Sequence, residues 1–151
     1  MYNYNDLVDK TVLVTGASGD IGHAICGKFL EQGCVVYALY CTNKAQLIEL
    51  QKHHPAGTKL HLLQGDLSNQ EDVSAICAQL SRDKGKLDVL VNNAGIVKDS
   101  LFAAMSFDDF SSVINMNLLG LFRLTKEVLL LLRSANNPTI INVASIAALV
   151  P

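Results

Sequence analysis

A glycine-rich turn near the start of the chain is the feature with the clearest chemical meaning. It joins a short β-branched run to an amphipathic stretch and has the sequence Thr15-Gly16-Ala17-Ser18-Gly19-Asp20-Ile21-Gly22. A strand, a glycine-rich turn and a helix in this order bring free amide N–H groups and the positive end of a helix dipole to one point. That point suits a phosphate or pyrophosphate group, although two glycines alone would also fit an ordinary tight turn.

A second cluster of small and polar residues follows a later apolar run and has the sequence Asn92-Asn93-Ala94-Gly95. Small side chains allow a ligand to lie against the backbone, and each asparagine amide offers donors and an acceptor with which to hold a neighbouring strand. Taken alone, these four residues would also fit a turn. Their place after a strand puts them at the sheet edge where ligands bind in doubly wound proteins.

The elements that would position these turns alternate along the chain. Apolar runs predict strands over residues 11–15, 35–40, 59–63, 87–92 and 139–143, with helices over 21–32, 44–54, 70–82 and 107–133. Capping boxes at Ser68 and Ser106 mark the starts of the last two helices. The alternation predicts one α/β domain over residues 1–151, a Rossmann-type doubly wound parallel sheet in the strand order 3-2-1-4-5.

The two turns together resemble the motifs of the short-chain dehydrogenase/reductase family. Asp66, Asn117 and Ser145 extend the resemblance, which runs from about residue 10 to residue 151. Within the family, segments 92–101 and 121–126 are most similar to the 3-oxoacyl-acyl-carrier-protein reductases of fatty acid biosynthesis. The resemblance implies an NAD(P)H-dependent carbonyl reductase or alcohol dehydrogenase that acts on a small-molecule or acyl-thioester carbonyl.

The resemblance also implies a role for individual residues. Ser145 would bind the substrate carbonyl oxygen, Asn117 would organise a water in a proton relay, and no metal is implied. Asp66 and Leu67 would meet the adenine. The implied cofactor-binding residues are Gly16, Ser18, Gly19, Asp20, Ile21, Gly22, Tyr40, Cys41, Asp66, Leu67, Asn93, Ala94 and Gly95.

Two departures from the family pattern affect these expectations. Asp20 stands where the family has a glycine, which places a carboxylate beside the expected phosphate site. The chain also reaches Pro151 before the Tyr-x-x-x-Lys motif that supplies the family's proton donor. We therefore expect the sheet to be truncated after strand five and the chain alone to be inactive. The alternative function is a truncated, non-catalytic dinucleotide-binding module.

The end of the second strand bears on the choice of cofactor. NAD-preferring relatives have an acidic residue there, which binds the ribose 2′-hydroxyl, whereas this chain has Tyr40 and Cys41. The missing carboxylate favours NADP over NAD. Gly19 weakens that expectation, because many NADP-binding relatives carry a basic residue at this position, and it leaves Lys44 as the nearest cation.

Composition limits the other partners. The chain has 151 residues, of which 50% are hydrophobic and 17% charged, with a formal net charge of -2 and no basic stripe for nucleic acid. No apolar run approaches the ~20 residues of a membrane helix, so we expect a cytoplasmic protein. The cysteines lack zinc-ligand spacing, which predicts reduced thiols. The broad apolar surface predicted for helix 107–133 fits a helix buried on most sides. The family resemblance implies a homo-oligomer for the complete enzyme, because the corresponding helix of the family builds a dimer interface.

Overall fold

The computed structural model describes residues 5–146 and contains a five-stranded parallel sheet. The strand order is β3-β2-β1-β4-β5, which confirms the expected doubly wound topology. The strands are β1 (Thr11–Thr15), β2 (Val35–Tyr40), β3 (Leu60–Gln64), β4 (Val89–Asn92) and β5 (Thr139–Asn142).

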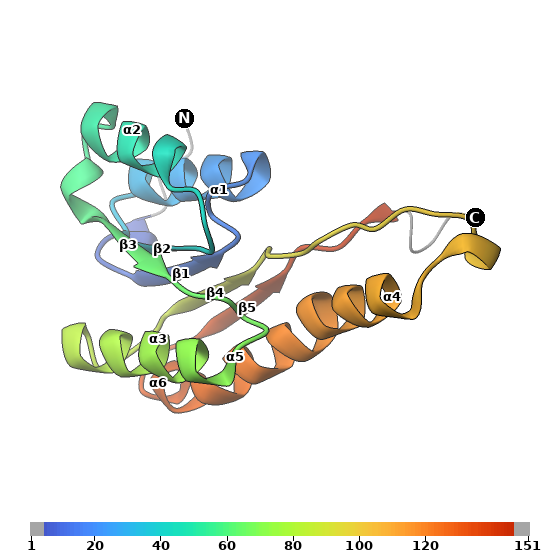
Figure 1. Cartoon of the computed structure of the whole chain (residues 1–151). Coiled ribbons are helices and arrows are strands. Elements are labelled where there is room, and N and C mark those ends of the chain that lie inside the picture. The colour runs from blue at the N-terminus through green and yellow to red at the C-terminus, as the bar shows by residue number, and fades with distance from the viewer. Residues whose placement is uncertain (1–4, 147–151) are drawn as a thin grey trace.

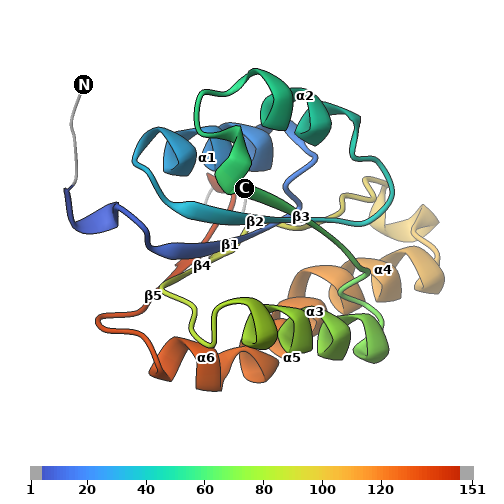
Figure 2. The same cartoon turned by 90° about the vertical axis from the view of Figure 1, so that its left-hand side faces the viewer.

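Helices cover both faces of the sheet. Helices α1 and α2 lie on one face, whereas α3, α5 and α6 lie on the other and α4 extends beyond the end of the sheet (Figures 1 and 2). The helices are α1 (Asp20–Glu31), α2 (Ala45–His53), α3 (Gln70–Asp83), α4 (Phe107–Ile114), α5 (Leu121–Glu127) and α6 (Leu129–Arg133). Short 3-10 turns are η1 (Asn5–Leu7), η2 (Gly57–Lys59) and η3 (Phe102–Ala104), and η4 (Asn115–Gly120) is π-helical.

The core is divided between the two faces by the alternation of side chains along each strand. On β1, Leu13 packs into the cluster that contains α3, α5 and α6, whereas Val12 and Val14 pack into the cluster that contains α1 and α2. All residues of β1, β2 and β4 are buried, as expected for strands covered on both sides.

Strand β5 departs from that expectation, because all four of its residues are exposed. In residues 5–146 it pairs with β4 alone. Ile140 and Ile141 are 44% and 40% exposed. The apolar sequence of this strand therefore predicted its place in the sheet correctly but not its burial.

The boundaries of the predicted elements mostly agree to within one or two residues, as is usual at frayed ends. The helix predicted over residues 107–133 is divided into α4, η4, α5 and α6, with a break at Val128, whose φ and ψ are -86° and 2°. The hydroxyl half of the capping box at Ser106 is confirmed, since the hydroxyl accepts a hydrogen bond from the Asp109 N–H at 3.0 Å. The Asp109 carboxylate accepts from the Ser106 hydroxyl at 2.8 Å.

The capping box expected at Ser68 is wrong. Helix α3 is capped by Asn69, whose side-chain oxygen accepts from the N–H of Glu71 at 2.7 Å. The Ser68 hydroxyl instead donates to a carboxylate oxygen of Asp66 at 2.7 Å. A neighbouring asparagine thus provides the cap one residue later, because its amide oxygen serves the same donors.

Candidate functional site

Two turns meet at the carboxyl edge of the sheet, and Thr15 joins them. The Thr15 hydroxyl accepts from the backbone N–H groups of Asn93 and Ala94, both at 2.9 Å, and donates to the Val91 carbonyl at 3.2 Å. The Asn93 side-chain amide donates to the carbonyls of Thr15 at 3.0 Å and Gly16 at 3.3 Å. The turn after β1 is therefore fixed to the turn after β4, which confirms the strand-holding role expected of an asparagine here.

Glycine is required at two positions of the first turn. Gly16 has a φ of +60°, and a Cβ there would lie 2.8 Å from the Ala94 Cα. A Cβ on Gly22 would lie 2.3 Å from the Gly16 carbonyl oxygen. The spacing of these glycines thus reflects a turn packed tightly against the start of α1.

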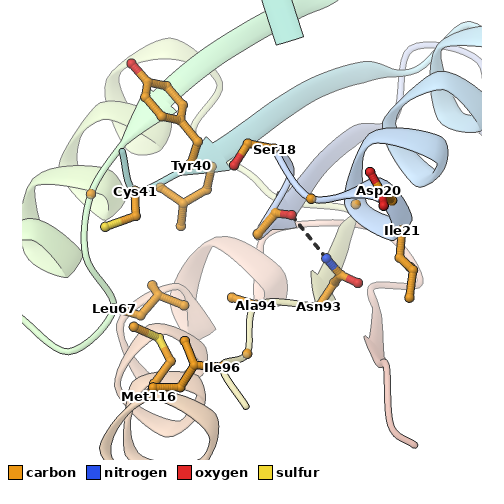
Figure 3. A pocket seen from close by; sticks show the side chains of 16 residues that line it. Ser18, Asp20, Ile21, Tyr40, Cys41, Leu67, Asn93, Ala94, Ile96 and Met116 are labelled. Atoms are coloured by element: carbon orange, nitrogen blue, oxygen red, sulfur yellow. Dashed lines mark hydrogen bonds between the residues drawn. The ribbon is translucent and has the colours of Figure 1, made fainter. Parts of the chain in front are cut away.

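A cavity of about 490 Å³ opens above these turns (Figure 3). Its volume lies within the range of roughly 300–1,000 Å³ that is typical of small-molecule sites. The lining residues come from the turns after β1 and β4, the ends of β2 and β3, and the η4 region: Gly16, Ser18, Gly19, Asp20, Ile21, Gly22, Leu39, Tyr40, Cys41, Gly65, Leu67, Asn93, Ala94, Gly95, Ile96 and Met116.

The N-terminus of α1 faces this cavity without a side-chain cap. Its N-cap residue is Gly19, and no side chain accepts a hydrogen bond from the first amides, whereas Asn69 and Ser106 cap α3 and α4. The first N–H groups of a helix have no partner within the helix, so those of α1 are available to a ligand. The first intrahelical bond is that of the His23 N–H to the Gly19 carbonyl at 2.8 Å.

The corner after β2 contributes a tyrosine and a cysteine in different ways. Tyr40 is only 6% exposed, and its ring turns away from the cavity into the α1-side core (Figure 3). Cys41 is exposed and lines the cavity. Burial, assisted by the carboxylates of Asp66 and Asp72, raises the pKa of the Cys41 thiol.

Asp66 is the one predicted cofactor-binding residue that does not line the cavity, although Gly65 and Leu67 on either side of it do. Its carboxylate accepts from the Ser68 N–H at 2.8 Å and from the Ser68 hydroxyl at 2.7 Å. It therefore stabilises the turn that leads into α3.

The sequence of the chain matches one family along most of its length. The model of the short chain dehydrogenases matches residues 10–151. The chain belongs to the short-chain dehydrogenase family. Members of this family are oxidoreductases that use NAD or NADP, and the uncapped helix above a glycine-rich turn fits the pyrophosphate of such a cofactor.

Curated short-chain dehydrogenase relatives are longer than this chain. The chain is 38% identical to nodulation protein G of Rhizobium sp. (strain N33), 37% to acetoacetyl-CoA reductase of Shinella zoogloeoides and 31% to the 3-oxoacyl-[acyl-carrier-protein] reductase of Thermotoga maritima. These matches cover 93%, 92% and 95% of this chain, but 56%, 56% and 58% of the respective relatives. The chain thus spans a little over half their length.

Solved structures of the family show the same fold. The ligand-free aldohexose dehydrogenase of Thermoplasma acidophilum is 32% identical and superposes with a TM-score of 0.82 over 97% of this chain and 53% of its own. A short-chain dehydrogenase of Brucella melitensis, described as glucose/ribitol dehydrogenase, is 28% identical with a TM-score of 0.89, over 98% of this chain and 61% of its own.

The predicted catalytic residues, Asn117 and Ser145, are not part of the cavity wall. Asn117, in η4, clamps the backbone of Ile96: its Oδ1 accepts from the Ile96 N–H at 2.8 Å and its Nδ2 donates to the Ile96 carbonyl at 2.9 Å. Ser145 follows the carboxyl end of β5 and is exposed. Neither residue is among those that line the cavity.

A pair of asparagines, of which Asn92 is buried and Asn142 exposed, holds the strand that leads to Ser145. The Nδ2 group of Asn92 donates to Oδ1 of Asn142 at 2.9 Å, and the two residues are register partners of β4 and β5. Asn92 is 4% exposed, and its Oδ1 has no hydrogen-bond partner among the described residues. The pair therefore fixes β5, and with it the start of the Ser145 loop, against the rest of the site.

Four residues of the cavity wall were not predicted: Leu39, Gly65, Ile96 and Met116. Gly65 directly follows β3, so its place as a small residue at a strand end could have predicted it as part of the wall. Met116 and Ile96 reach the wall because η4 packs against the loop after β4, and no local pattern reveals that packing.

Among the described residues, no helix combines the length and the apolar character needed to cross a bilayer.

Proposed function

We propose that the cavity binds a nicotinamide dinucleotide and that the protein is an NAD(P)H-dependent carbonyl reductase or alcohol dehydrogenase. The observation that carries this proposal is the uncapped N-terminus of α1, which faces a cavity lined by both motif turns. Family membership supports it independently. When bound, the nicotinamide would supply or accept the hydride that changes a carbonyl into an alcohol.

The residues fit the parts of such a cofactor. The amides beside Gly19 and Ile21 would bind the pyrophosphate, and Leu67 would pack against the adenine. Asn93, Ala94 and Gly95 would lie along the adenosine ribose, because they are small and their backbone borders the cavity. Asp66 would meet the adenine only through its backbone or after leaving Ser68, since its carboxylate is already hydrogen-bonded.

Ser145 and Asn117 would serve the substrate side. The Ser145 hydroxyl would donate to the carbonyl oxygen and stabilise the negative charge that develops there. Asn117 holds Ile96 through both ends of its amide, so its remaining N–H and lone pair would be available to orient a water.

As substrate we propose a 3-oxoacyl thioester, which would place the protein in fatty acid biosynthesis. The names of two relatives, an acetoacetyl-CoA reductase and a 3-oxoacyl-[acyl-carrier-protein] reductase, support this class. The aldohexose dehydrogenase supports a sugar as the alternative. A cytoplasmic location is proposed from the sequence alone.

A truncated, non-catalytic dinucleotide-binding module is the alternative function. The tyrosines within residues 5–146, Tyr37 and Tyr40, both lie on β2, which is separated from β5 by two strands. Neither can therefore act as a proton donor beside Ser145. Saturable dinucleotide binding without turnover of 3-oxoacyl thioesters or aldohexoses would support this module over the reductase.

We propose NADP(H) rather than NAD(H) as the cofactor. Support comes from the absence of a carboxylate at the end of β2 and from Lys44, the N-cap of α2, which is exposed and forms no ion pair with the described residues. In water, the loss of one positive charge about 4 Å from a phosphate weakens the binding of that phosphate about fivefold. Lys44→Ala should therefore weaken NADPH binding about fivefold and leave NADH binding unchanged.

The test compares the binding and turnover of NADPH and NADH in wild type, Lys44→Ala and Lys52→Ala. Lys52→Ala is the matched control, because Lys52 lies at the other end of α2. Cys41→Asp should shift the preference towards NADH, because Cys41 is exposed and lines the cavity whereas Tyr40 is buried. A wild-type preference for NADH, or equal loss in both lysine variants, would contradict the choice of NADP(H).

A further inference from the structure

Among the described residues that line the cavity, Asp20 is the only charged one. The other polar residues of the wall, Ser18, Tyr40, Cys41 and Asn93, are uncharged, and the remainder are glycines or apolar residues. Of the described residues that line the cavity, none is a lysine, an arginine or a histidine. A dinucleotide carries its negative charge on the pyrophosphate, so the charge of the wall has the same sign as the charge of the proposed ligand.

Asp20 lies at the edge of the cavity wall. It is the first residue of α1, directly after the N-cap Gly19, and it lies beside Ile21 (Figure 3). It is exposed and makes no ion pair with the described residues. Its backbone φ is not positive, so replacement of the family glycine strains nothing.

The positive end of the α1 dipole attracts two negative groups. One is the Asp20 carboxylate in the first turn, and the other is an anion that binds at the free amides. The Asp20 carboxylate is present at this helix end before any ligand binds. A pyrophosphate that arrives at the amides of α1 then meets both the attractive dipole and the repulsive carboxylate.

We propose that Asp20 is an electrostatic determinant of cofactor affinity, which holds the binding of a dinucleotide below what the turn would otherwise allow. The inference rests on the proposed function. Because the repulsion acts on the pyrophosphate, which NAD(H) and NADP(H) share, it lowers the affinity for both. It is thus separate from the choice between them at the Lys44 corner.

The size of the effect follows from Coulomb's law. Two phosphate charges about 7 Å from a carboxylate in water predict a threefold to tenfold gain in affinity when the charge is removed. Asp20→Asn removes the charge and keeps the shape. The gain should be largest at about 0.01 M salt, where the Debye length is about 30 Å, and should nearly vanish at about 1 M, where it is about 3 Å.

The experiment is a calorimetric titration of NADPH and of NADH into wild type, Asp20→Asn and Asp108→Asn at these two salt concentrations. Asp108 is the matched control, because it is an exposed aspartate in the first turn of α4 and does not line the cavity. We expect Asp20→Asn to bind both cofactors threefold to tenfold more tightly at low salt and equally at high salt, with Asp108→Asn like wild type.

Two results would overturn the inference. Equal affinities of wild type and Asp20→Asn at low salt would show that the carboxylate does not act on the ligand, while the proposed function stands. A gain in affinity that is as large at high salt as at low salt would show that Asp20 acts through direct contact with the ligand and not through its charge. If none of the three proteins binds either dinucleotide while remaining folded, the proposed function itself fails.

Discussion

The four cysteines differ in their access to solvent, and one of them reports on the cavity. Cys26 and Cys34 are buried, and burial raises their pKa values to about 12 and about 11, whereas Cys41 is exposed and lines the cavity. Burial also raises the pKa of Cys77, which is partly buried and donates to the Glu127 carbonyl. The thiols are therefore distinguishable by chemical modification.

We predict that iodoacetamide modifies Cys41 first in the folded protein and that a bound dinucleotide protects it. The rate should fall about tenfold when the cofactor is present at ten times its dissociation constant. Peptide mass spectrometry after timed alkylation measures this rate for each cysteine. The rate at Cys77 is the internal control, and equal rates at Cys41 with and without cofactor would place the ligand elsewhere.

At the residue level, the sequence motifs predicted most of the cavity wall but not the direction of every side chain. Asn93 and Gly16 are brought together as expected, since both belong to motifs with a backbone role. Tyr40 turns into the core because Val36, Ala38 and Tyr40 alternate onto the α1 face of β2. Tyr40→Asp, the change that the sequence suggests for reversing cofactor choice, would therefore bury a carboxylate, and Cys41→Asp is the better test.

At the scale of elements, the amino ends of β1 and β4 are joined by a buried carboxylate far from the cavity. Asp88 accepts from the Thr11 N–H at 2.9 Å and from Lys10 Nζ at 3.0 Å, and its side chain is 2% exposed. Burial raises the pKa of Asp88, but the Thr11 N–H and the Lys10 and Lys86 ammonium groups outweigh it, so the pKa lies below its ordinary value.

We predict that Asp88→Asn lowers the free energy of unfolding by about 1–3 kcal/mol at pH 7, because the Thr11 and Lys10 donors lose a charged acceptor. A carboxylate with a lowered pKa stabilises the fold above its unfolded pKa, and this stabilisation is lost as the pH falls through the folded value. The difference from wild type should therefore be constant from about pH 5 to 8 and shrink below about pH 4.

Urea unfolding at several pH values measures this difference, with Asp99→Asn, an exposed loop aspartate, as the control. A difference that is the same at pH 3 and pH 7 would show that the carboxylate charge is not the stabilising factor.

The elements themselves were largely predictable, because alternating strand and helix patterns with short turns admit few topologies. The first residue of α3 was not predictable. Ser68 and Asn69 are both residue types that cap helices, and Asn69 is the cap because the Ser68 hydroxyl is bonded to Asp66. The break at Val128 was also hidden, because the leucine-rich run on either side has no helix breaker.

At the scale of the whole molecule, two apolar surfaces of the described residues are exposed. One runs along α4 and α5, where Phe107, Phe110 and Phe122 are 80%, 52% and 59% exposed. The other is β5, whose outer edge has no strand partner among residues 5–146. Large apolar patches and open strand edges both promote association with another chain.

We predict that a protein of residues 1–151 associates with itself and that charge on the α4–α5 surface reduces the association. The double variant Phe110→Glu, Phe122→Glu should shift the size distribution towards the monomer, because burying those carboxylates in an interface would be costly. Sedimentation velocity measures this shift, and Val97→Glu, at a 76% exposed loop residue, is the control. A wild-type monomer at high concentration would contradict the prediction.

The central claim is that the cavity between the two motif turns is a nicotinamide dinucleotide site, and an equilibrium titration of the purified protein tests it most directly. We predict that NADPH and NADH compete for one site per chain with dissociation constants between about 1 μM and 1 mM, the range that is typical of Michaelis constants. Cys41→Trp should abolish or greatly weaken binding by filling the cavity, whereas Cys41→Ser should bind like wild type, with both variants unfolding at the wild-type temperature. A folded wild-type protein that binds neither dinucleotide, or a Cys41→Trp variant that binds as tightly as wild type, would contradict the claim.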